Sequence, residues 1–225
     1  LHPLIRSTNT PEMQERGQLV RTEPPLALRP LLKDLQSAFD SVFDDIDVEA
    51  SDGIGRKTEA PWARIFSKAM SPNPRSGFYL VIHFAADGSA VFITVGCGST
   101  IWSGGDLRAV SDEALARRTD WARQVVHQRW GTIEPFASTM QLGAKAELPK
   151  TFEKATALAF RIPLTELLDT DIRSVMYLAA ERLGEIYLAQ LSQRDVAPGG
   201  QGTAAIEGIS RPLGRRAGKQ GFGLT

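Results

Sequence analysis

Three segments of the chain carry apolar residues at steps of three and four positions, which is the spacing of one face of an α-helix. They cover about 28–44, 111–127 and 171–193, and we expect a helix over each. Ser111 has the side chain of a helix N-cap, and Gly131 is typical of the residue that ends a helix. The apolar stripe of the first segment is Leu28, Leu31, Leu32, Leu35, Phe39, Val42 and Phe43.

Residues 78–96 carry the alternation of a β-hairpin. Asp87-Gly88 stands between two alternating runs, which is the sequence signature of a type I′ turn. A turn at these two residues fixes the register of the strands. The predicted apolar core face pairs Phe84 with Val91, Ile82 with Ile93, and Leu80 with Val95. The opposite face carries Tyr79, Val81, His83 and Ala85 against Gly96, Thr94, Phe92 and Ala90, a set that suits either a pocket wall or a surface under a helix.

These elements predict an α+β fold with a twisted, mixed or mainly antiparallel sheet, a central hairpin and flanking helices. A further strand is expected at Lys154–Ile162, and residues 44–52 are expected to be an acidic connector. The polar, aperiodic residues 1–25 predict a disordered leader. We expect the folded domain at 26–195. The glycine-rich and then basic segment 196–225 predicts a flexible linker to a further domain.

The composition is that of an ordinary globular protein, with 42% apolar residues, 23% charged residues and a formal net charge of zero. Without net charge the chain has no overall attraction for nucleic acid, so any basic surface must be local. Cys97 is the only cysteine and there are three histidines. This excludes a disulfide framework and argues against a metal site. No apolar run is long enough to span a membrane, and we expect a cytoplasmic protein without a cofactor.

Residues 53–58 form a glycine-flanked segment with a basic pair. It is not a nucleotide-binding phosphate loop, because the Walker pattern needs glycine where Arg56 and Ser51 stand. One interpretation is a hinged loop with Ile54 at its tip, which would insert between base steps while Arg56 and Lys57 bind phosphates. The alternative is a surface turn whose Ile54 packs into the core.

Four side chains after this loop are candidates for ligand contact. Trp62 and Tyr79 have flat rings that could stack on a base. His83 could hydrogen-bond a base edge, and Arg75 could bind a phosphate from the rigid loop before the hairpin. Each also has an ordinary structural interpretation, as a core aromatic, a buried histidine or a connector residue.

Catalytic signatures are missing from the sequence. There is no nucleophile elbow and no histidine cluster of a metal-dependent nuclease. Glu147 and Lys150 lack the preceding acidic partner that a nuclease core requires, and Cys97 has no candidate base beside it. The sequence therefore predicts a binding domain without a catalytic residue.

Several separated elements together resemble a known family. Gly53-x-Gly55-x-x-Thr58-x-x-Pro61-Trp62 is followed in order by Gly77-Phe78-Tyr79-Leu80-Val81 and by Asp87-Gly88-Ser89. This succession resembles the N-terminal DNA-binding domain of McrB, the specificity subunit of a modification-dependent restriction system. The resemblance is strongest over about 50–100 and extends more weakly over about 28–193.

The resemblance implies a domain that binds duplex DNA and flips a methylated or hydroxymethylated cytosine into a pocket. A separate nuclease or NTPase region of the parent protein would then act on the DNA. Ile54 matches the loop tip that fills the gap left by the flipped base, where the best-known member has an aromatic residue. Trp62 and Tyr79 match aromatic pocket positions, and His83 matches one that is aliphatic in that member. The candidate contacts to the DNA backbone are Gly53, Gly55, Arg56, Lys57, Thr58 and Arg75.

A second interpretation remains open at this point. The face of the hairpin that carries Tyr79 and His83 could instead bind a protein partner or a small ligand in a defence protein, without base flipping. Binding of modified DNA that is lost on Trp62→Ala or Tyr79→Ala would separate the two.

Overall fold

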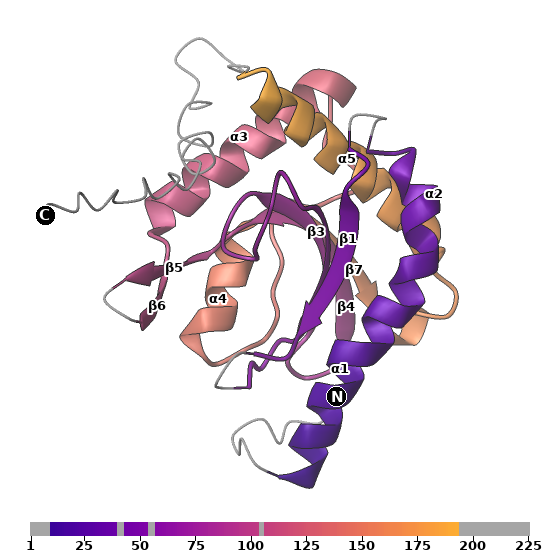
Figure 1. Cartoon of the computed structure of the whole chain (residues 1–225), viewed down its shortest axis with the longest axis vertical. Helices are drawn as coiled ribbons and strands as arrows, with labels where there is room; N and C mark the ends of the chain where they lie inside the picture. The colour runs from indigo at the N-terminus through magenta and orange to yellow at the C-terminus, as the bar shows by residue number, and fades with distance from the viewer. Residues whose placement is uncertain (1–9, 40–42, 54–56, 104–105, 194–225) are drawn as a thin grey trace, which may run out of the picture.

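The computed structural model describes residues 10–39, 43–53, 57–103 and 106–193, and it has the predicted α+β architecture (Figure 1). A five-stranded antiparallel sheet lies at its centre, with strand order β1-β2-β3-β4-β7, and β5 and β6 form a separate two-stranded sheet. The strands are β1 (Ile46–Ser51), β2 (Trp62–Ser67), β3 (Phe78–Phe84), β4 (Ala90–Cys97), β5 (Thr100–Ser103), β6 (Asp106–Ala109) and β7 (Thr156–Pro163).

The helices divide between the two faces of the large sheet. α3 and α5 pack against β3, β4 and β7, and α1 runs along β1. On the other face, Phe152 of α4 stacks on His83 of β3. The helices are α1 (Pro11–Leu28), α2 (Leu32–Gln36), α3 (Asp112–Trp130), α4 (Glu147–Lys154) and α5 (Ile172–Leu191), with 3₁₀ turns at Arg29–Leu31 and Leu164–Glu166.

The predicted core face of the hairpin is confirmed away from the turn, whereas Phe84 and Val91 beside the turn are only half-buried. β3 and β4 pair in the predicted register, and Leu80, Ile93 and Val95 are completely buried. They belong to one apolar cluster with Leu183 and Ile186 of α5. Burial of such side chains stabilises the fold by about 25 cal/mol for each Å² of apolar surface. The other side of the hairpin is also largely covered, because Ala85, Ala90 and Phe92 belong to a second, smaller apolar cluster.

The predicted turn type is wrong, although the register that it implied is right. The amide of Gly88 donates to the carbonyl of Ala85 at 3.0 Å, so Ala86 and Asp87 are the central residues of the turn. Gly88 has a φ of 74°, whereas Asp87 does not adopt the positive φ that a type I′ turn requires. The Asp87 side chain instead accepts a hydrogen bond from the amide of Ser89 at 2.9 Å.

The second and third predicted helices are confirmed as α3 and α5. The hydroxyl of Ser111 accepts a hydrogen bond from the amide of Ala114, and Gly131 ends α3 with a φ of 73°. The carboxylate of Asp171 caps α5 in the same way. These caps satisfy backbone groups that a helix end leaves without partners.

The predicted disordered leader is wrong for residues 11–25, which form most of α1. Thr10 caps this helix, and Met13, Gly17 and Val20 on one side of it are buried. The sequence looked aperiodic because the buried side also contains Arg16, whose partners are polar. The folded unit thus begins well before residue 26, while residues 1–9 lie outside the described part.

Two further predictions near the N-terminus need correction. The stripe at 28–44 does not form one helix, because α1 ends at Leu28 and a 3₁₀ turn and the short α2 follow. Its residues Leu28, Leu35 and Phe39 are nevertheless buried as predicted. The expected acidic connector contains β1, an edge strand in which only Val48 is fully buried. Charged side chains that flank such an inward apolar residue are usual on edge strands.

The strand expected at Lys154–Ile162 is confirmed as β7, with its start moved to Thr156. The residues before it form α4, which the sequence reasoning missed because Pro149 interrupts the pattern. Pro149 lies in the first turn of α4, where a helix tolerates proline. None of the described helices is long and apolar enough to cross a membrane. The expected linker at 196–225 lies outside the described residues.

Candidate functional site

A cavity of about 330 Å³ opens on the face of the sheet opposite to α3 and α5. We call it the sheet pocket. Its floor is built by Trp62 of β2, by Tyr79, Val81 and His83 of β3, and by Gly96 of β4. Because side chains alternate along a strand, these residues share the face that the core does not use. The volume is within the range of about 300–1,000 Å³ that is usual for small-molecule sites.

The walls of the sheet pocket come from four separate segments. α4 contributes Leu148 and Phe152, and the β5–β6 ribbon contributes Thr100 and Leu107. The loop before β3 and the stretch from the end of β1 to the start of β2 form two further walls. The residues from those two segments are Ser51, Gly53, Thr58, Pro74 and Arg75.

His83 is the most unusual side chain of the sheet pocket. It lies between Trp62 and Phe92 in the ladder and stacks on Phe152, with ring centroids 5.7 Å apart and planes at 24°. The residue is only 6% exposed, and its Nδ1 has no hydrogen-bond partner among the described residues. This burial lowers the pKa of His83 to about 3, so the ring is neutral at physiological pH.

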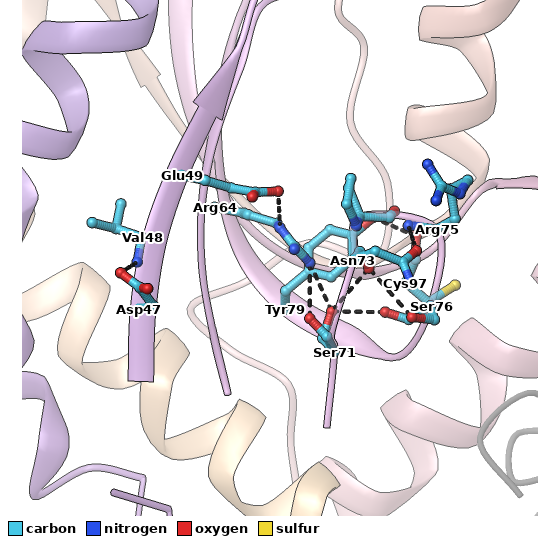
Figure 2. A network of polar contacts seen from close by, with 11 residues as sticks. Asp47, Val48, Glu49, Arg64, Ser71, Asn73, Arg75, Ser76, Tyr79 and Cys97 are labelled. Atoms are coloured by element: carbon cyan, nitrogen blue, oxygen red, sulfur yellow. Dashed lines mark hydrogen bonds and ion pairs between the residues drawn. The ribbon is translucent and has the colours of Figure 1, made fainter. Parts of the chain in front are cut away.

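Tyr79 is held in place by polar contacts at its hydroxyl (Figure 2). Its hydroxyl donates to the carbonyl of Pro74 at 2.8 Å and lies 3.2 Å from the carbonyl of Cys97. Its ring centroid lies 5.2 Å from the guanidinium carbon of Arg64. Burial raises the pKa of Tyr79 above its usual value, so the phenol stays protonated. The ring therefore has a fixed position beside the pocket.

Arg64 organises the polar layer beneath Tyr79. Its side chain is completely buried, and its Nε donates to Glu49 at 2.7 Å. Its Nη1 donates to the hydroxyl of Ser71 at 2.8 Å, and that hydroxyl in turn donates to the carbonyl of Ser76 (Figure 2). Burial lowers the pKa of Arg64, against the effect of Glu49. Arg64 thereby ties the loop that carries Arg75 to the sheet.

Two glycines at the end of β4 allow close approach of protein backbone rather than of a ligand. A Cβ on Gly96 would lie 2.9 Å from the carbonyl oxygen of Ala155. A Cβ on Gly98 would lie 2.1 Å from the carbonyl oxygen of Arg75. The predicted pairing of Tyr79 with Gly96 is confirmed, and the space beside Gly96 is taken by Ala155. These contacts bring α4 and the Arg75 loop against the sheet pocket.

The segment between β1 and β2 is held to the domain by α1. Asp52 is buried and forms ion pairs with Lys57 and with Arg21, the latter at 2.5 Å. Arg16 donates to the carbonyl of Thr58 at 2.8 Å. The ammonium group of Lys57 is therefore paired with a buried carboxylate, and only 13% of the Lys57 side chain is exposed.

The structure brings together six of the residues singled out in the sequence. Those that line the sheet pocket are Gly53, Thr58, Trp62, Arg75, Tyr79 and His83. Lys57 does not line it. Ile54, Gly55 and Arg56, which include the predicted wedge, lie outside the described residues.

An apolar rim at the sheet pocket was missed in the sequence. It consists of Trp102, Leu107 and Leu148, which are 60%, 42% and 38% exposed. Trp102 pairs directly with Leu107 across β5 and β6, so the two share the face of the ribbon that lines the pocket. Gly104-Gly105 between the two runs is a hairpin signal that could have revealed this ribbon.

The described residues offer little for metal or thiol chemistry. They contain no group of three or more histidine, cysteine or acidic residues placed to hold a metal ion. Cys97 is buried at the sheet pocket, and burial raises the pKa of its thiol to about 11. A thiol with this pKa is a poor nucleophile at neutral pH.

Comparison with known families gives one match. The family model described as "MrcB-like, N-terminal domain" matches residues 6–180. The matched range includes all of α1, and it contains every residue that lines the sheet pocket. A comparison with curated proteins finds no match.

Proposed function

Since this chain belongs to the family of MrcB-like N-terminal domains, DNA-binding specificity modules of restriction factors, we propose that it reads modified cytosine in duplex DNA. The base, 5-methylcytosine or 5-hydroxymethylcytosine, would be flipped out of the helix into the sheet pocket. The observation that carries this proposal is a cavity with aromatic rings, built on a rigid sheet. It lies beside the segment whose tip was predicted to fill the gap in the duplex.

The energetics of flipping suit such a pocket. Extruding a base costs a few kcal/mol of stacking and pairing. Stacking of a base on an aromatic side chain returns about 1–3 kcal/mol. Trp62 and Tyr79 both line the sheet pocket, and Tyr79 is already fixed by its hydrogen bonds. Little side-chain freedom is then lost when the base enters.

The duplex would lie over the mouth of the sheet pocket. Arg75 lines the pocket and has no ion-pair partner among the described residues, which leaves it able to bind a phosphate. The apolar rim, with Trp102 as its most exposed member, would face the grooves next to the flipped nucleotide. Cleavage or translocation of the DNA would be the task of a nuclease or NTPase region of the parent protein.

A competition shift assay at stated salt tests this function. The competing duplexes are identical except for one site, which holds cytosine, 5-methylcytosine, 5-hydroxymethylcytosine or N4-methylcytosine. The proposal predicts that at least one duplex modified at carbon 5 competes better than the unmodified duplex. Equal or absent competition by all four would contradict it and favour a pocket for a small ligand or a protein partner.

A further inference from the structure

His83 carries a buried ring nitrogen that has no hydrogen-bond partner among the described residues. Nearly all buried polar atoms in proteins are hydrogen-bonded, and an exception calls for an explanation. The Nδ1 atom of His83 is such an exception among the described residues, and the ring belongs to the lining of the sheet pocket. Nδ1 itself is covered, so a ligand in the pocket can supply the missing partner when the His83 ring turns about its Cβ–Cγ bond.

The surroundings of His83 define what it can recognise. Trp62, Phe92 and Phe152 are its neighbours across the strands and from α4, and none of them offers a charge. The ring is therefore neutral, with one nitrogen that donates and one that accepts. A hydroxyl group also both donates and accepts, so it fits either tautomer of the ring. A methyl group does neither, and where the carbon-5 substituent faces His83 it would leave the buried nitrogen without a partner.

We propose that His83 hydrogen-bonds a hydroxyl group on the flipped base, so that the sheet pocket selects 5-hydroxymethylcytosine over 5-methylcytosine. This inference rests on the proposed function and specifies the substrate of the same pocket. A site that hydrogen-bonds its substrate discriminates against an analogue without that group, because the protein partner is then left buried and unpaired. We expect a preference of about tenfold, the effect of one neutral hydrogen bond.

The test uses three duplexes that differ at one base, namely 5-methylcytosine, 5-hydroxymethylcytosine and 5-ethylcytosine. The ethyl group has nearly the size of the hydroxymethyl group but lacks the hydroxyl, so it separates hydrogen bonding from shape. The wild-type protein should bind the hydroxymethyl duplex about tenfold more tightly than either of the others. This comparison leaves the protein unchanged and does not depend on how a variant folds.

Two variants assign the preference to His83. His83→Leu should bind the three duplexes with affinities equal within about twofold, because the side chain no longer hydrogen-bonds. His83→Gln keeps a donor and an acceptor and should retain part of the preference. A preference for hydroxymethyl that survives unchanged in His83→Leu would overturn the assignment.

The failure of this inference can be told from the failure of the proposed function. If all three modified duplexes bind equally, and better than unmodified DNA, only the inference about the hydroxyl falls. If no modified duplex binds better than unmodified DNA, the proposed function falls and the inference falls with it.

Discussion

Trp62 lines the sheet pocket and is only partly buried, so its removal should cost the fold less than removal of a core aromatic residue. Trp62→Ala is expected to weaken binding of the modified duplex by about five- to a hundredfold, since stacking on one base contributes about 1–3 kcal/mol. A shift assay with the duplex that wild type prefers measures this loss. Trp130→Ala is the matched control, because Trp130 packs against Arg182 and does not line the pocket. Similar losses in both variants would count against stacking at Trp62.

His83 also has a consequence for stability. Its pKa of about 3 in the folded protein compares with about 6.5 for an exposed histidine. Between these values the unfolded chain binds a proton that the folded protein does not bind. This group therefore makes the free energy of unfolding decrease as the pH falls from about 6.5 toward 3.

His83→Leu should remove that contribution. We expect the free energy of unfolding of the variant to fall less steeply than that of wild type when the pH is lowered from 7 to 5. Urea unfolding at the two pH values measures both slopes. The same slope in the two proteins would show that the folded state binds the proton as readily as the unfolded chain does.

At the scale of elements, α1 holds the segment that flanks the sheet pocket. Arg16→Ala removes the hydrogen bond to the carbonyl of Thr58 and leaves that buried carbonyl without this donor. A loss of this kind costs about 1–3 kcal/mol, so the free energy of unfolding should fall by that amount.

Arg29→Ala is the control for this change. Arg29 is 60% exposed along its side chain, and its nearest approach to Asp47 is 3.7 Å. An exposed pair of this kind contributes about 0–1 kcal/mol. Urea unfolding measures the free energy of unfolding of both variants. Equal destabilisation would show that α1 does not hold the segment through Arg16.

The β5–β6 ribbon yields a different prediction, because Thr100 and Leu107 line the sheet pocket while Trp102 does not. Trp102→Ala should weaken binding of modified and unmodified duplexes by a similar factor, about threefold to tenfold, and so preserve their ratio. Titrations with the two duplexes measure that ratio. Tyr177→Ala on α5 is the control, since Tyr177 lies on the other side of the sheet. A changed ratio would place Trp102 inside the base-binding pocket.

Elements with a strong apolar period were predictable from the sequence, and those held by polar contacts were not. α3, α5 and the core face of the hairpin follow from spacing, and the cap at Ser111 follows from side-chain chemistry. α1 was missed because Arg16 and Arg21 make its contacts with ion pairs and a backbone carbonyl. Hydrophobic periodicity does not show that a charged side chain is buried against a partner far away in the sequence.

Part of the sheet pocket was predictable, because the register of the hairpin determines which of its residues share a face. The hairpin register placed Tyr79 and His83 on one face, and the structure puts both in the pocket. Phe152 and Leu148 could not be assigned, because they reach the pocket through α4, whose position depends on the close contact of Gly96 with Ala155. Contacts between elements so far apart in the chain carry no local signal in the sequence.

At the scale of the whole molecule, the two faces of the large sheet have different surroundings. The larger apolar cluster, formed with α3 and α5, lies on one face, and the sheet pocket lies on the other beside a smaller apolar cluster. Because the chain has no net charge, attraction for any DNA should be weak, and the pocket must supply the preference for a modified site.

The central claim, extrusion of the modified base into the sheet pocket, is tested most directly by fluorescence. A duplex carries 2-aminopurine next to the modified cytosine, and the protein is added at saturating concentration. Base flipping predicts a rise in fluorescence, because the neighbouring base loses its stacking partner when the modified base leaves the helix. The rise should be absent for the unmodified duplex and reduced in Trp62→Ala. Saturated binding of the modified duplex without any change in fluorescence would contradict base flipping.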